Sequence, residues 1–138
     1  MMKSTHNAYN QIKDLPFAVV LTHKTEPIIL VKFKENSCLD YNDVSQLVEL
    51  IYMLLKTDFQ FIISDCSSNF ESLDKETLDI FSDNISLRQA KAHGLIVNEL
   101  PMRLKTTYFI QLQENIVPTK LFSTNIEAEN WFKTEFLK

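Results

Sequence analysis

The chain has 138 residues, of which 45% are hydrophobic and 23% charged, and its formal net charge is −4. This length suits one domain that buries its own core without disulfides or metal. The acidic balance disfavours nucleic acid, because a nucleic-acid-binding surface must be basic to displace counterions from phosphates. The single glycine, Gly94, excludes a glycine-rich phosphate-binding loop, which needs several glycines.

The sequence predicts a cytoplasmic protein with no transmembrane segment. No apolar stretch approaches the roughly 20 residues that a membrane span needs. Residues 1–10 are polar and lack the apolar core of a signal peptide. Cys38 and Cys66 are far apart and belong to no CxxC pair, so we interpret both as free thiols in a reducing compartment.

The first half of the chain predicts a hairpin, a helix and a strand. Residues 17–22 and 28–33 are short apolar runs joined by a polar turn, which indicates an antiparallel hairpin. Helix-starting residues at 40–43 precede an apolar stripe with i, i+3, i+4, i+7 spacing, which predicts a helix ending near Lys56. The run 59–64 is typical of a strand.

The second half alternates helices and strands. After a polar loop, Asp74 is the expected N-cap of a second helix, and 94–97 reads as a short buried strand. Pro101 suits the first turn of a third helix, and 117–122 follows as the last strand.

The chain closes with a helix that has a clear start signal. Thr124 and Glu127 form the capping box T-x-x-E, and Ala128, Trp131 and Phe132 give the helix its inward face. The whole order is β-β-α-β-α-β-α-β-α. It predicts a single α/β domain over 1–138, with a mixed sheet covered by helices and a flexible N-terminal segment at 1–16.

Two segments resemble the STAS and SpoIIAA-like group of small α/β proteins. The run 117–132 (VPTKLFSTNIEAENWF) is similar to the ending of SpoIIAA-like bacterial proteins of unknown function, and 59–80 is similar to the STAS segment with a strand, an Asp-containing loop and a capped helix. The resemblance implies a regulatory or scaffolding module that binds protein partners. It also keeps a ligand role open, because SpoIIAA-like proteins resemble the lipid-binding SEC14 fold.

In STAS domains of the anti-sigma antagonist type, a serine in an Asp-Ser pair followed by glycine is phosphorylated. The loop 65–74 of this chain has neither the pair nor the glycine, and Ser72 lies nearest to the expected position. The resemblance to STAS domains therefore does not extend to their phosphorylation motif.

A ligand or switch loop is expected where the strand 59–64 ends. Ligands bind outside the carboxyl ends of parallel strands, and helix N-termini at the same edge favour anions. Arg88 and Arg103 flank the fourth expected strand and complete a small anion site in this hypothesis; the alternative is solvated charge with ordinary capping. The residues of the loop hypothesis are Asp65, Cys66, Ser67, Ser68, Ser72, Asn98 and Arg103.

No catalytic or metal site is expected. Cys66 or Ser67 follows a strand, but neither has the small flanking residues of a nucleophile elbow, and His93 is the only obvious base. The three histidines show no metal-ligand spacing, and no cofactor is implied.

The third expected helix is apolar nearly all round. Met102, Phe109 and Ile110 lie outside its main stripe, which predicts either an interface or deep burial between the sheet and the last helix. We therefore expect a non-catalytic protein-interaction or regulatory module, acting as a homodimer through this helix. The alternative is a carrier of a small apolar or anionic ligand, and an enzyme ranks third.

Overall fold

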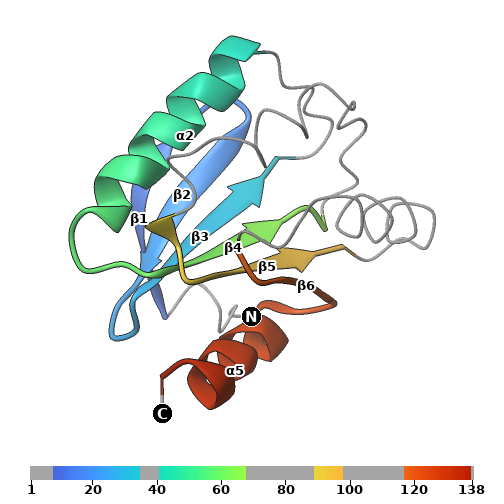
Figure 1. The fold of residues 1–138 in the computed structure, drawn as a ribbon. Coiled ribbons are helices and arrows are strands. Elements are labelled where there is room, and N and C mark those ends of the chain that lie inside the picture. The colour runs from blue at the N-terminus through green and yellow to red at the C-terminus, as the bar shows by residue number, and fades with distance from the viewer. Residues whose placement is uncertain (1–7, 35–40, 68–88, 98–116, 138) are drawn as a thin grey trace.

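A computed structural model describes residues 8–34, 41–67, 89–97 and 117–137. Within these ranges six strands form one mixed sheet in the order β1-β2-β3-β4-β5-β6, with helices on both of its faces (Figure 1). The strands are β1 (Tyr9–Asp14), β2 (Ala18–His23), β3 (Ile28–Phe33), β4 (Phe61–Asp65), β5 (Ala92–Ile96) and β6 (Thr119–Phe122), and the helices are α2 (Tyr41–Leu55) and α5 (Asn125–Glu135).

The sheet combines an antiparallel and a parallel half. β1, β2 and β3 form an antiparallel meander, and β3, β4, β5 and β6 pair in parallel. The predicted hairpin of β2 and β3 is confirmed, as are the parallel pairs that follow it. The expected α/β class with a mixed sheet is therefore confirmed for the part of the chain described.

β1 is a strand that the expected element order lacks. Residues 9–14 lie in the expected flexible segment 1–16, yet they form β1 and pair with β2 from Tyr9 opposite His23 to Asp14 opposite Val19. No apolar alternation marks this strand in the sequence, because five of its six residues are exposed. Only Tyr9 is buried there, at 4% exposure.

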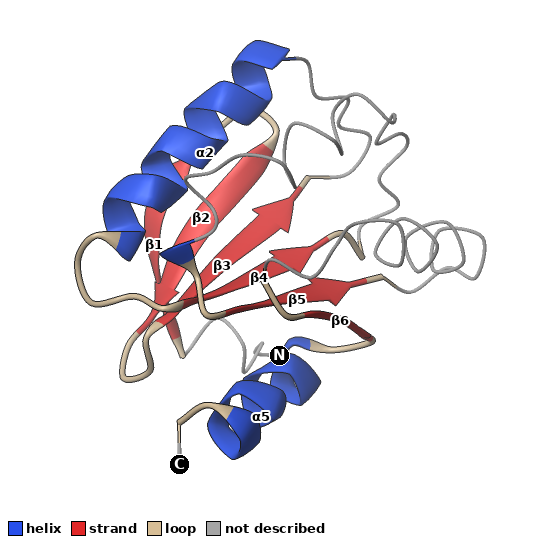
Figure 2. Ribbon diagram, viewed as in Figure 1, coloured by secondary structure: helices blue, strands red, loops and turns tan. Residues whose placement is uncertain are grey.

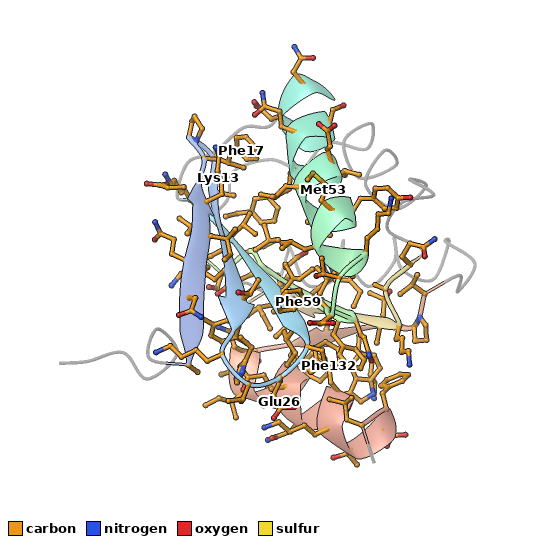
Figure 3. The ribbon with its side chains drawn as sticks, turned by 90° about the vertical axis from the view of Figure 1, so that its left-hand side faces the viewer. Lys13, Phe17, Glu26, Met53, Phe59 and Phe132 are labelled. Carbon is orange, nitrogen blue, oxygen red and sulfur yellow. The ribbon has the colours of Figure 1, made fainter. Side chains whose placement is uncertain are left out.

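Helix α2 covers one face of the sheet and confirms the predicted apolar stripe (Figure 2). Leu47 and Ile51 are fully buried against the inward residues of β2, β3 and β4, because side chains at i and i+4 lie on one face of a helix. Phe17, just before β2, packs into the same layer, and Figure 3 shows it beside the helix that carries Met53.

Helix α5 covers the opposite face, and its predicted capping box is confirmed. The Thr124 side chain accepts from the backbone of Glu127, whose carboxylate accepts from the backbone of Ser123 and Thr124. Phe132 is fully buried and stacks on Phe61 of β4, with ring centroids 4.5 Å apart. Figure 3 shows Phe132 on the α5 side of the sheet.

The other two expected helices, after Asp74 and after Pro101, lie outside the described residues. The order of the described strands nevertheless agrees with the expected alternation from β2 onwards.

Candidate functional site

The carboxyl end of β4 holds three of the expected loop residues close together. Asp65 is the last residue of β4 and is buried, at 6% exposure. Its Oδ1 accepts a hydrogen bond from the backbone N–H of Ser67 at 3.0 Å and another from the Ser67 hydroxyl at 2.6 Å. The backbone N–H of Cys66 donates to the carbonyl of Ile96 at 2.8 Å. These groups therefore stabilise the chain where it leaves the sheet.

The strand registers place Asp65 in a row of side chains that crosses the sheet on the α5 face. Lys32 of β3 is its neighbour on one side, and Ile96 of β5 is its neighbour on the other. Lys32 is half-buried, so a cation and a buried carboxylate lie next to each other in this row. The members of the row, from β1 to β6, are Asp14, Val19, Lys32, Asp65, Ile96 and Phe122.

Cys66 is unsuited to nucleophilic chemistry in these surroundings. Burial and, to a smaller extent, the charge of Asp65 raise the pKa of its thiol to about 12. The thiolate is the reactive species of cysteine, so the thiol of Cys66 stays protonated at neutral pH. Its half-buried side chain packs against the apolar layer under α2.

His93 does have a polar partner, and that partner is a serine that the sequence analysis did not consider. The Ser64 hydroxyl and the His93 Nε2 are 2.8 Å apart, joining β4 to β5 on the α2 face of the sheet. Ser64 is only 1% exposed, and burial lowers the pKa of His93 to about 4. A neutral imidazole with a buried hydroxyl partner satisfies two polar groups inside the sheet layer.

The signal that could have identified this pair was the alternation of side chains along each strand. Ser64 and His93 both fall on positions that face α2, together with Ile62 and Leu95. Deriving the contact from sequence would have required the register between β4 and β5, which no local pattern supplies.

The order of the described strands in the sheet provides no ligand crevice at the expected ligand loop. Ligand crevices in open α/β sheets form where the order of parallel strands reverses. The described parallel strands run from β3 to β6 in chain order without a reversal. The sheet therefore has no such switch point within these strands, although the carboxyl end of β4 carries polar side chains.

The remaining predicted site residues lie outside the described ranges. They are Ser68, Ser72, Asn98 and Arg103 of the loop hypothesis, with Arg88, and Met102, Phe109 and Ile110 of the interface hypothesis. Among the residues that the structure does describe, no three His, Cys, Asp or Glu side chains are grouped so that they could hold a metal ion.

The outer edge of β1 is a second candidate site. β1 is the first strand of the sheet, and no described strand pairs with its outer edge. Ile12 lies at an irregularity of the β1–β2 ladder, between Gln11 and Lys13, and is 46% exposed. An exposed strand edge presents unpaired backbone N–H and C=O groups to another chain.

The fold and these two sites define an α/β domain with a bonded polar group at the carboxyl end of β4 and an outer edge of β1 with which no described strand pairs. A family model described as a domain of unknown function (DUF7793) matches residues 22–135, which is most of the sequence. The chain therefore belongs to this family. A search of curated proteins finds no match. No described helix is both long and apolar enough to span a membrane.

Proposed function

We propose that the protein is a non-catalytic protein-interaction or regulatory module of STAS-like type, and that it acts as a homodimer. The observation that carries the proposal is the outer edge of β1, with which no described strand pairs, on a six-residue strand of which five residues are exposed. By contrast, the described polar groups at the carboxyl end of β4 are bonded to each other or protonated. This contrast favours binding of a partner at the edge of β1 over a chemical reaction at the carboxyl end of β4.

The partner that we propose for this edge is a second copy of the chain. A two-fold axis makes residue i of one copy face residue j of the other, and j face i. If the axis passes between Gln11 and Ile12, Asn10 faces Lys13 and Tyr9 faces Asp14. In this register Lys13 faces an asparagine and Asp14 faces a tyrosine, so no like charges lie opposite each other. Like charges in opposite positions would destabilise an antiparallel pair.

The same edge limits the strength of the dimer. Bulges and charged side chains are features that protect strand edges from pairing, and β1 has both, at Ile12 and at Lys13. We therefore expect a reversible dimer that dissociates on dilution.

Native mass spectrometry of the gently purified protein, over a range of concentrations, tests the proposal. Ile12→Lys places a further positive charge on the edge, beside Lys13 and at an exposed position, so the variant should fold and remain monomeric. Ile126→Lys is the matched control, because Ile126 is similarly exposed, at 57%, but lies on α5. This control should dimerise as the wild type does.

Three results would contradict the proposal in different ways. If the dimer persists in Ile12→Lys and is lost in Phe109→Asp, the interface is the apolar third helix expected from the sequence, and not the edge of β1. A wild type that stays monomeric and bare at all concentrations would exclude the homodimer. An added mass of a few hundred daltons on each subunit would favour the carrier of a small ligand instead.

A further inference from the structure

We infer that Tyr9 and Glu129 form a latch through which helix α5 holds strand β1 on the sheet, so that loosening α5 frees β1. The latch is defined as the Tyr9 side chain and the Glu129 carboxylate. The coupling between the two elements follows from their contacts. Its role as a control of dimerisation rests on the function proposed above.

The latch is a partly buried contact between distant parts of the chain. The Tyr9 hydroxyl donates a hydrogen bond of 2.6 Å to the Glu129 Oε2, across 120 positions of sequence. The Tyr9 ring is 4% exposed and meets His23 edge to face, with centroids 4.8 Å apart. Burial, and then the bond to Glu129, raise the pKa of the phenol above its usual range, so the hydroxyl remains a donor.

Few other side chains of β1 make contacts with the described part of the chain. The residues of β1 after Tyr9 are all exposed, so within the strand itself Tyr9 supplies the only buried ring. A second anchor is the Lys34–Asp14 ion pair, whose side chains are 37% and 59% exposed. Exposed ion pairs contribute little because water and salt screen them. Tyr9 therefore anchors the first end of β1, and Leu15, just after the strand, anchors the other end in the layer under α2.

Helix α5 is anchored independently of β1 and acts as the fixed part of the latch. Phe132 stacks on Phe61, and Ala128 is fully buried above Gly94 of β5. These contacts connect α5 to β4 and β5, three or more strands away from β1 in the sheet order. If α5 loosens, Glu129 moves with it, and β1 at the far edge of the sheet loses its hydrogen bond to the helix.

Release of β1 would change the edge that the molecule presents. The new outer edge would be β2, whose residues are mostly buried in the latched state, including Val20 and Leu21. An apolar edge of this kind pairs less selectively than a polar one. The state of α5 would then decide whether the molecule offers the edge of β1 or that of β2.

Hydrogen exchange measured by mass spectrometry tests the coupling, at a concentration low enough to keep the protein monomeric. Glu129→Ala should accelerate exchange of the β1 amides about ten-fold or more relative to Asn130→Ala, an exposed neighbour on the same helix. Tyr9→Phe, which keeps the ring, should accelerate exchange in β1 and leave α5 protected. Phe132→Ala should accelerate exchange in both elements.

The inference is overturned if Glu129→Ala and Asn130→Ala give the same exchange in β1 while both variants retain the far-UV circular dichroism of the wild type. It is also overturned if Phe132→Ala frees α5 and leaves β1 protected. A wild type that never dimerises, combined with faster β1 exchange in Glu129→Ala, would establish the latch and contradict only the proposed dimer.

Discussion

Gly94 of β5 lies directly against Ala128 of α5: a Cβ added to Gly94 would be 3.0 Å from the Cβ of Ala128 and 3.6 Å from the ring of Phe122. Real Cβ atoms rarely approach as closely as the first of these distances. The only glycine of the chain therefore lets the last helix approach the sheet. Its role is in packing, on a strand that lies between β4 and β6.

Gly94→Ala should lower the free energy of unfolding by about 1–3 kcal/mol, because an extra methyl group in a packed layer forces its neighbours apart. Urea denaturation monitored by the fluorescence of Trp131 measures the change. Adding Ala128→Gly should restore part of the loss by removing the opposing methyl, although this change alone costs about 1 kcal/mol of helix propensity. Strictly additive effects of the two substitutions would contradict the contact.

The elements that the sequence predicts well are those encoded by nearby residues. The stripe of α2, including Leu47 and Ile51, repeats every three or four positions and needs no knowledge of the sheet. The capping box of Thr124 and Glu127 spans one helical turn. Both are confirmed at their expected places because local geometry alone specifies them.

The features that the sequence analysis missed depend on register between distant strands. Tyr9 reaches Glu129, and Ser64 reaches His93, only because the sheet brings their elements together. The same is true of Gly94, whose place under Ala128 follows from the packing of α5. Of the candidate loop, Asp65, Cys66 and Ser67 were placed correctly at the end of a strand, but their internal bonding was not predictable from composition.

The N-cap of α5 offers a direct test of local stabilisation. Thr124→Ala removes the side-chain acceptor of the Glu127 backbone N–H and should cost about 1 kcal/mol of stability. Thr124→Ser keeps a hydroxyl at the same position and should cost much less. Thermal unfolding by circular dichroism distinguishes the two. Equal loss in both variants would mean that the methyl group of Thr124, and not its hydroxyl, is what matters.

Cys66 should react slowly with thiol reagents while the protein is folded. In a Cys38→Ser background, iodoacetamide at pH 8 should modify the folded chain on the order of a hundred-fold more slowly than the urea-unfolded chain, because so little thiolate is present. The pKa of about 12 that burial and Asp65 impose is the cause. Asp65→Asn should raise the rate, since it removes the negative charge and keeps an acceptor for Ser67.

Modification of Cys66 at the same rate in the folded and unfolded chains would contradict this prediction. It would also reopen the question of a reactive thiol at the carboxyl end of β4, which the raised pKa argues against.

His93 should make the stability of the fold depend on pH between about 4 and 6.5. Burial lowers its pKa from 6.5 to about 4 in the folded state. As the pH falls through this window, the unfolded chain takes up a proton that the folded chain does not, so the unfolded state is favoured. The contribution of neutral His93 is complete above pH 6.5, declines below it, and levels off near pH 4. The loss should be about 1–3 kcal/mol.

Urea denaturation of the wild type and of His93→Gln at several pH values isolates this effect, because the carboxylates titrate in both proteins. The free-energy difference between them should narrow as the pH falls from 6.5 towards 4. Ser64→Ala is the matched control: it removes the partner hydroxyl but keeps the imidazole, so it should be less stable at neutral pH and retain the pH dependence. Parallel curves for the wild type and His93→Gln would show that the imidazole is not held as a neutral group in the folded state.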